Sequence, residues 1–233
     1  ENFLYLLKGN KYTPLEAEIL DLMMILHAEH GGGNNSTFTM RLVSSAMTDT
    51  YSATAAAIGS LKGRLHGGAN LQVLEMMTNI KKNVKNWNDK EEIKSYLMKI
   101  LRKEAYDRSG KIYGIGHAVY TLSDPRAQLL KTKAIDLAKA KGLEAELQLY
   151  LNIEELAPKA LAEYKNGNVK PVCANVDFFS GFVYEAIEIP HELFTPMFAI
   201  ARMSGWAAHR LEEMTFASRR IIRPAYKNIL QNE

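Results

Sequence analysis

The stretch LKGRLHGGAN, residues 61–70, places a single histidine between glycines at the corner between two helical patterns. A segment rich in Ala, Ser and Thr precedes it, and an apolar segment at helical spacing follows it. Clustered glycines indicate a backbone with positive φ or a close approach of another group to the main chain. His66 is therefore either a hydrogen-bonded residue of a helix–helix corner or a ligand-binding residue, and the corner itself predicts a helical fold.

Signals for helix starts and ends extend this pattern in both directions. Thr13-Pro14 followed by Glu16 predicts a capping box, and Asp124-Pro125 repeats the combination of a capping residue and proline. Gly142 ends the second of these helices after a lysine-rich turn. The expected helices cover residues 14–29, 37–61 (as one or two helices), 71–80, 89–103, 125–142, 144–164, 175–187 and 190–214.

Only residues 111–121 and 169–174 have a pattern compatible with strands. We therefore expect an all-α fold with about nine helices. The charged run 81–165 lies between apolar flanks, which suggests a small domain inserted into a larger one. The expected division is a large domain from 1–72 and 188–233, with a small domain at 73–187.

The composition excludes some classes of protein. With 233 residues and 47% hydrophobic residues the chain can bury a sizeable core. Its net charge of +3 is too small to indicate nucleic-acid binding. No apolar segment reaches the roughly 20 residues of a membrane span, and no export leader is visible. A single cysteine, Cys173, is compatible with a reducing compartment, so we expect a cytoplasmic protein.

Two further residues have the chemistry of a site. His117 follows glycine in KIYGIGHAVY, residues 111–120, where a ligand could reach it. The third glycine of a dinucleotide fingerprint is missing there. Asp177 is set among aromatic residues, and desolvation would raise its pKa toward the range of a general base. The alternative for Asp177 is an ordinary carboxylate in the first turn of a helix.

Other polar residues are open to two interpretations. His27 and His30 could share a metal, but their spacing is not that of a zinc motif, and no ligand cluster accompanies them. Arg126, Arg202 and Arg223 lie in or beside apolar segments, where a guanidinium needs a carboxylate or phosphate partner. They either form internal salt bridges or bind an anionic ligand.

Taken together, these segments resemble citrate synthase. The matching stretches are LHAEHGGGNNSTFTMR (26–41), YSATAAAIGSLKGRLHGGAN (51–70), GIGHAVYTLSDPR (114–126), NVDFFSGFVYEA (175–186), FAIARMSGWAAHRLEE (198–213) and RRIIRP (219–224). They follow the order and spacing of the family and cover most of the chain. The resemblance implies a mostly α-helical homodimer whose large and small domains close over the substrates.

The resemblance also implies an activity. Citrate synthases condense acetyl-CoA with oxaloacetate to give citrate and free CoA, a reaction of the tricarboxylic acid cycle, and are acyltransferases that convert the acyl group to alkyl on transfer. No metal or other cofactor is implied, because the CoA thioester is a substrate. The implied partners are oxaloacetate, the acyl-CoA and a second copy of the chain.

Residue roles follow from the matching motifs. His66 would donate a hydrogen bond to the thioester oxygen, Asp177 would take the methyl proton, and His117 would protonate the ketone of oxaloacetate. A helix beginning near Gly68 would keep His66 neutral. The implied oxaloacetate ligands are His30, Arg126, Arg202 and Arg223, the last acting in the partner's site. The implied CoA loop is Lys111, Ile112, Tyr113, Gly114, Ile115 and Gly116.

The sequence also departs from the family. Family members are considerably longer, so we expect a C-terminal fragment whose own activity is open. Arg64 stands where the family commonly has proline, and Thr121 stands where many members carry a basic residue for CoA. Two alternatives remain: 2-methylcitrate synthase, which uses propionyl-CoA, and a non-catalytic helical interaction module. One methyl group changes pocket fit by only about 1–3 kcal/mol, so motifs do not separate the two enzymes.

Overall fold

Capping side chains mark the start of five helices in the computed structural model, which describes residues 1–9, 11–63, 65–117, 119–168, 170–216 and 220–225. The Thr13 hydroxyl accepts the backbone N–H of Glu16, and the Glu16 carboxylate accepts the N–H of Thr13, so the predicted capping box is confirmed. Asp124 caps the helix that begins at Pro125, and Gly142 ends it with φ 68°.

The described residues form ten α-helices and one 3₁₀ helix, and no β-strand. The helices are α1 (Asn2–Lys8), α2 (Pro14–His27), α3 (Asn35–Ser45), α4 (Thr50–Leu61), α5 (Ala69–Asn83), α6 (Lys90–Leu101), α7 (Pro125–Lys141), α8 (Glu144–Tyr164), α9 (Val176–Ala186), the 3₁₀ helix η1 (His191–Leu193) and α10 (Phe194–Thr215). The predicted all-α class is confirmed.

The helix bounds differ from the sequence-based expectation at several places. The sequence analysis missed α1, and α2 ends at His27, two residues before the expected end. The long helix expected from 190 begins with η1, so α10 starts at Phe194. In their described residues, the two segments with strand-like patterns form one antiparallel bridge, between Ile115 and Ala174, and no strand.

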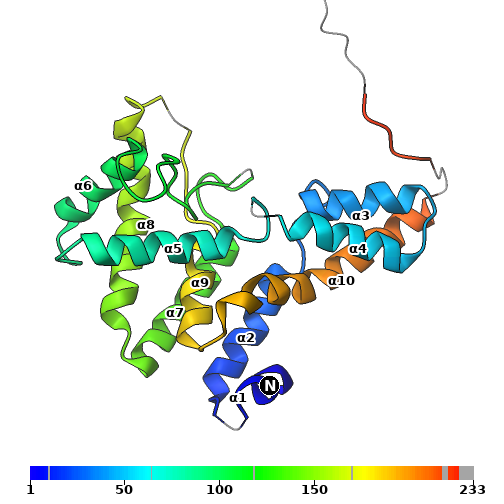
Figure 1. The fold of residues 1–233 in the computed structure, drawn as a ribbon, viewed down its shortest axis with the longest axis horizontal. Coiled ribbons are helices and arrows are strands. Elements are labelled where there is room, and N and C mark those ends of the chain that lie inside the picture. The colour runs from blue at the N-terminus through cyan, green and yellow to red at the C-terminus, as the bar shows by residue number, and fades with distance from the viewer. Residues whose placement is uncertain (10, 64, 118, 169, 217–219, 226–233) are drawn as a thin grey trace, which may run out of the picture.

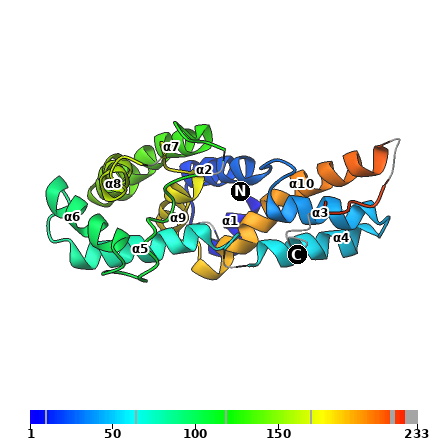
Figure 2. The same ribbon diagram turned by 90° about the horizontal axis from the view of Figure 1, so that it is seen from above.

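The helices gather at two ends of an elongated molecule (Figure 1). At one end α3 packs against α4 and α10, and at the other α6 packs on α8, while α9 contacts α5 and α7. The view from above shows α5 and the α7–α8 pair on opposite sides of α9 (Figure 2). The turn between α4 and α5 (described residues 62–63 and 65–68) and the start of α10 (residues 194–202) lie between the two ends, at the waist of the molecule.

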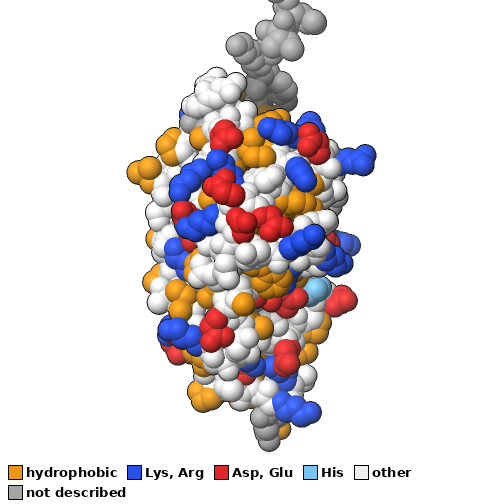
Figure 3. Space-filling view, turned by 90° about the vertical axis from the view of Figure 1, so that its left-hand side faces the viewer, with side chains coloured by type: hydrophobic (Ala, Val, Ile, Leu, Met, Phe, Trp, Pro, Cys, Tyr) orange, Lys and Arg blue, Asp and Glu red, His pale blue; other side chains and the backbone are white. Residues whose placement is uncertain are grey.

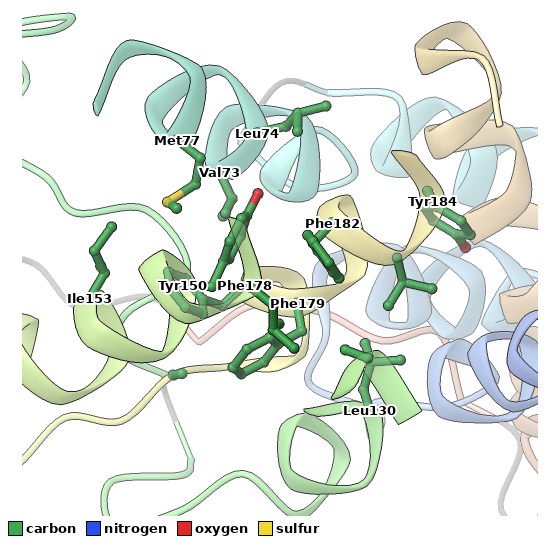
Figure 4. Close-up of a cluster of buried hydrophobic side chains, with 14 of the residues drawn as sticks. Val73, Leu74, Met77, Leu130, Tyr150, Ile153, Phe178, Phe179, Phe182 and Tyr184 are labelled. Carbon is green, nitrogen blue, oxygen red and sulfur yellow. The ribbon is translucent and has the colours of Figure 1, made fainter. Parts of the chain in front are cut away.

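Two apolar clusters hold this arrangement together. The larger one centres on α9, whose Phe178, Phe179 and Phe182 contact the ring of Tyr150 from α8, as Figure 4 shows. The same cluster takes in α5, α6, α7 and the buried face of α2. The smaller cluster joins α3, α4 and α10 around Trp206. α2 thus packs with the helices of the expected small domain, and the boundaries at 73 and 187 stay a prediction.

The end formed by α6 and α8 carries interspersed acidic and basic side chains (Figure 3). Three ion pairs account for part of this pattern, joining Lys90 and Lys159 to Glu155 and Lys94 to Glu163. Exposed pairs of this kind contribute little to stability. Among the described residues, no helix is both long enough and apolar enough to cross a membrane.

A buried carboxylate joins α1, α2 and α7. Glu16, only 1% exposed, contacts Lys8 at 3.2 Å and Lys141 at 2.8 Å. Burial acts to raise the pKa of Glu16, but hydrogen bonds from Lys141, Thr13 and Lys8 outweigh it and lower that pKa to about 2. Because this pKa lies below that of the unfolded chain, the ion pairs stabilise the fold above about pH 4.5 and lose that effect as the pH falls toward 2.

We therefore predict that Glu16→Gln lowers the free energy of unfolding by about 3 kcal/mol at pH 7. The difference from wild type shrinks between about pH 4.5 and 2, where the wild-type carboxylate takes up its proton. Urea unfolding at pH 7 and pH 3 measures both effects. Glu18→Gln, at an exposed ion pair with Lys133, is the matched control and leaves the midpoint almost unchanged. An equal loss in the two variants would contradict the prediction.

Candidate active site

A small cavity of about 80 Å³ lies where the two ends of the molecule meet. Its walls come from the loop after α2, the α4–α5 turn, the loop before α7, and the starts of α9 and α10. The lining residues are His30, Asn34, His66, His117, Arg126, Asn175, Val176, Asp177 and Phe198. The structure thus brings the three predicted catalytic residues and two of the predicted substrate ligands to one place.

The ring of His117 is held in one tautomer by its own loop. Its Nδ1 accepts the backbone N–H groups of Val119 at 3.0 Å and Tyr120 at 3.1 Å. In the neutral ring the proton is therefore on Nε2. Burial, followed by the proximity of His30 and Arg126, lowers the pKa of His117. At neutral pH His117 is an uncharged ring with an N–H that it can donate to an acceptor in the cavity.

His30 lies directly against this donor. The Nε2 atoms of His30 and His117 are 3.0 Å apart, and the rings stack with their centroids 5.0 Å apart. Since Nε2 of His117 carries the proton, it donates the hydrogen bond, and Nε2 of His30 accepts that hydrogen bond. Burial lowers the pKa of His30, and Arg126 and Arg202 lower it further. A ligand carbonyl that enters between the rings would replace His30 as the acceptor.

Arg126 is oriented by a buried aspartate two residues before it. The Asp124 carboxylate, fully buried, accepts Nε of Arg126 at 3.0 Å and Nη2 at 2.8 Å. It also accepts the backbone N–H of Val176, which ties α7 to α9. Burial acts to raise the pKa of Asp124, but the Arg126 hydrogen bonds outweigh it and lower that pKa. Nη2 of Arg126 lies 3.4 Å from Nε2 of His117, so the guanidinium faces the cavity beside that ring.

His66 occupies the turn that the sequence singled out. Its Nε2 lies 3.4 Å from the backbone N–H of Ser36, which donates to it, and 2.9 Å from the Ser36 hydroxyl. That contact places the proton of the neutral ring on Nδ1, which leaves an N–H for a ligand. The pKa of His66 is lowered to about 4.

The cause of this low pKa differs in part from the expectation. The sequence analysis relied on the helix that begins after Gly68, and α5 does begin at Ala69. Burial is the largest cause, followed by the charge of Arg202 and the neighbouring His30. In addition, the N–H that touches the ring belongs to the first turn of α3, not to α5.

The glycines around His66 allow the turn to pack tightly. A Cβ on Gly67 would overlap the carbonyl oxygen of Leu61, the last residue of α4. The Gly67 carbonyl also accepts the Thr195 hydroxyl at 3.0 Å. The turn is thereby fixed to the start of α10 at the waist of the molecule. Arg64, named above as a departure from the family pattern, lies outside the described residues.

Asp177 lies in the first turn of α9, two residues after the cap Asn175, whose side chain accepts the backbone N–H of Asp177. Burial raises its pKa to about 6, although Arg126 and Arg202 act in the opposite direction. At neutral pH the group is mostly ionised and is a stronger base than an ordinary aspartate. It is therefore able to take up a proton from a ligand in the cavity.

Arg202 is a buried cation that lacks a carboxylate partner in the described part of the chain. Its Nε donates to the carbonyl of His27 at 2.7 Å and its Nη1 to Asn34 at 3.3 Å, while Nη2 has no partner there. The guanidinium also lies 4.7 Å from the Phe198 ring centroid. Burial lowers its pKa to about 10, so it keeps its charge at neutral pH. A buried guanidinium of this kind favours an anionic ligand.

A second cavity, of about 280 Å³, lies beside the loop that was predicted to bind CoA. Lys111, Ile112, Tyr113, Gly114 and Ile115 line it together with Leu101, Gly110, Ala157 and Leu161. Gly116 does not; its N–H donates to the carbonyl of Cys173. Gly114, at φ 78°, packs so closely on Phe178 and Val73 that a Cβ would not fit. The cavity has mainly apolar walls and one exposed lysine at its rim.

The structure does not bring Arg223 to the first cavity. The side chain is exposed, in a segment whose Ile222 N–H donates to Ser45 at the end of α3. Figure 1 shows this segment beside α3, at the α3–α4 end of the molecule. His27 is buried, and its Nδ1 lies 2.8 Å from the carbonyl oxygen of Met23. That nitrogen is therefore engaged by its own helix and not directed to a ligand shared with His30. No group of three or more potential metal ligands is found among the described residues.

Two residues that hold predicted site residues in place, Ser36 and Asp124, were not predicted to belong to the site. Ser36 positions His66 and also accepts the Trp206 indole N–H at 3.2 Å, but a serine in a polar stretch gave no signal. Asp124 was predicted only as a helix cap. The spacing of two residues between Asp124 and Arg126 could have indicated that one carboxylate caps the helix and holds the arginine as well.

Comparisons with known proteins agree with the motifs. The family model described as "Citrate synthase, C-terminal domain" matches residues 1–225. Citrate synthase 2 of Bacillus subtilis is 41% identical over 224 residues, which cover 96% of this chain and 54% of that protein. A 2-methylcitrate synthase of Shewanella oneidensis is 37% identical, with 96% and 53% covered. The chain therefore spans about half the length of the curated relatives it matches.

Solved structures show the same fold. Citrate synthase from Pyrobaculum aerophilum superposes with a TM-score of 0.76 at 33% identity, covering 100% of this chain and 53% of that one. The citrate synthase of Thermoplasma acidophilum, solved as a ternary complex with carboxymethyl coenzyme A and oxaloacetate, gives a TM-score of 0.76 at 29% identity, with 100% and 57% covered.

Proposed function

Because this chain belongs to the citrate synthase family, we propose that its central cavity is the site at which acetyl-CoA condenses with oxaloacetate to give citrate and CoA. The observation that carries the proposal is the meeting of Asp177, His66 and His117 around one cavity. These three residues supply a base, a neutral hydrogen-bond donor and a second donor, which are the groups that a carbon–carbon condensation of this type needs.

The first step forms the nucleophile. Asp177, with a pKa of about 6, takes a proton from the acetyl methyl group. The methyl C–H bond is a very weak acid, so the negative charge that moves to the thioester oxygen must be stabilised as it forms. The Nδ1–H of neutral His66 is the donor for that oxygen. A charged imidazolium is not required, because a preorganised neutral donor acts in a site that excludes water.

The second step forms the new carbon–carbon bond. The enolate carbon attacks the ketone carbon of oxaloacetate, the π electron pair of the C=O bond moves to the ketone oxygen, and that oxygen takes the proton from Nε2 of His117. His117 regains a proton and Asp177 releases one before the next turnover. Arg126 and Arg202 hold the two carboxylates of oxaloacetate. Its ketone oxygen replaces His30 as the acceptor of the hydrogen bond from His117, and the His30 ring lies beside it. Fixed orientation of two reactants lowers the barrier by several kcal/mol. Water then hydrolyses the citryl thioester to citrate and CoA, with no metal or cofactor in the proposed reaction.

CoA binding is proposed for the second cavity. Its apolar walls suit an aromatic base, and Lys111 at the rim suits a phosphate group. The ternary complex of the Thermoplasma enzyme with a CoA derivative and oxaloacetate supports the pairing of two ligand sites in this fold. Thr121 is exposed and uncharged, so Lys111 carries more of the proposed phosphate contact.

The assembly that we propose is a homodimer in the cytoplasm. Exposed apolar side chains, among them Phe38 and Leu42 on α3 and Tyr51 and Ile58 on α4, gather on neighbouring helices. Exposed apolar side chains on two packed helices favour association with another subunit. Arg223, exposed beyond the end of α3, would then act in the partner's site. The proposed large domain comprises 1–72 and 188–233, and the small domain 73–187 closes on it.

The test is release of CoA thiol by the full-length natural protein given oxaloacetate with acetyl-CoA or propionyl-CoA. We expect oxaloacetate-dependent thiol release, with a higher kcat/KM for acetyl-CoA. A higher value for propionyl-CoA would assign the 2-methylcitrate reaction, which the Shewanella relative supports. Absence of thiol release with either substrate, together with absence of oxaloacetate binding, would leave only the helical interaction module.

A further inference from the structure

One face of α10 holds the loop that carries His30. Three residues of α10 spaced three and four apart, and hence on one face, contact this loop at residues 27–34. Arg202 binds its two ends, at the carbonyl of His27 and the side chain of Asn34. Gly205 lies against the beginning of the loop so closely that a Cβ would overlap the carbonyl oxygen of Ala28.

The third contact runs through the carboxylate of Glu29. One oxygen, Oε1, accepts the backbone N–H groups of His30 and Gly31, and so fixes the backbone that carries the His30 ring. The other oxygen, Oε2, lies 2.9 Å from Nε2 of His209 on α10. Because the Glu29 side chain is 45% exposed, its orientation depends on this second contact.

The tautomer of His209 follows from its other neighbour. Nη1 of Arg41 lies 2.8 Å from Nδ1 of His209, and a guanidinium has donors only. Nδ1 is therefore the acceptor, and Nε2 carries the proton that is donated to Glu29. Arg41 is itself held by Glu212 at 2.5 Å and by Glu213 at 3.2 Å, both on α10. Arg41 thus donates a hydrogen bond to His209, and His209 donates one to Glu29.

We propose that His209 is a positioning residue for oxaloacetate binding and acts through Glu29 on His30. His209 does not line the cavity, whereas His30 does, and Nε2 of His30 lies 3.0 Å from the donor atom of His117. Without the contact from His209, the Glu29 carboxylate is no longer held and no longer fixes the backbone N–H groups of His30 and Gly31. The His30 ring is then misplaced relative to the ketone of oxaloacetate. This inference rests on the proposed function, since it assigns the substrate that His30 contacts.

The experiment compares His209→Ala, His209→Gln and wild type in the full-length natural protein. We expect His209→Ala to raise the KM for oxaloacetate about tenfold or more with kcat changed less than about threefold, because a ligand group is displaced while the base and donors remain. His209→Gln restores most of the affinity, since its amide N–H can donate to Glu29 while its oxygen accepts from Arg41. His191→Ala, an exposed histidine on η1, is the matched control and leaves both constants unchanged.

A structural role alone predicts a different pattern. If His209→Ala lowered stability while the KM for oxaloacetate stayed at the wild-type value, the proposal would be overturned. Glu29→Gln gives a second variant that keeps the α10 packing, and it is expected to raise the KM in the same direction. An unchanged KM in both variants contradicts the proposal.

A measurement that needs no substrate distinguishes failure of the proposed function from failure of the positioning role of His209. Amide hydrogen exchange of His30 and Gly31 reports the Glu29 contact directly. If the wild-type protein neither reacts with nor binds oxaloacetate, the assigned substrate fails. Faster exchange in His209→Ala than in wild type and in His209→Gln then still supports positioning of the loop, whereas equal exchange in all three refutes it.

Discussion

Asp177→Asn is expected to lower kcat for condensation by about 10³-fold or more while oxaloacetate still binds, because the amide cannot take the methyl proton. The guanidinium groups of Arg126 and Arg202, which are proposed to bind the two carboxylates, are unaffected by the change. The measurement is thiol release under saturating substrates, with oxaloacetate binding followed by calorimetry. Turnover near the wild-type rate would refute the assignment of Asp177 as the base.

The same substitution has an opposite effect on stability. Since burial raises the pKa of Asp177 to about 6, above its ordinary value of 3.8, the ionised group costs stability above about pH 6. Asp177→Asn removes that cost, so the free energy of unfolding at pH 7 rises by up to about 3 kcal/mol. The difference disappears as the pH falls below about 4. Asp136→Asn, on the exposed side of α7, is the control for both activity and stability.

His66→Ala is expected to reduce kcat by about 10²- to 10³-fold, which is the usual loss when one preorganised donor to a developing oxyanion is removed. The KM for oxaloacetate changes much less, because His66 is proposed to contact the thioester and not the ketoacid. Thiol release with each substrate varied in turn separates the two effects. A main effect on the KM for oxaloacetate would contradict the role given to His66. His191→Ala again serves as the histidine control.

Much of the fold was readable from local signals in the sequence. Thr13, Asp89, Asp124 and Asn175 each cap the start of a helix by a contact within three residues, so their effects do not depend on the rest of the chain. The short α1 has no side-chain capping hydrogen bond at its start, and its one buried residue, Leu4, packs on distant helices. It could not be predicted because tertiary packing, and not local pattern, stabilises it.

The site was predictable only in part. The motifs named His66, His117 and Asp177, and the structure places them around one cavity. Their electrostatics could not be read from the sequence, because the low pKa of His66 and the high pKa of Asp177 come mainly from burial by segments far away in the chain. The contact of His66 with Ser36 spans 30 residues, and that of His209 with Glu29 spans 180, so no local pattern indicates either.

In the proposed reaction His66 and Asp177 act together on one proton transfer. The most direct test is a double-mutant cycle with His66→Ala, Asp177→Asn and the double variant, measured as kcat for condensation. Because the donor stabilises only the charge that the base creates, the double variant is expected to be about as slow as Asp177→Asn alone. Losses that multiply, to about 10⁵-fold or more in the double variant, would show that the two residues act independently and would contradict the account.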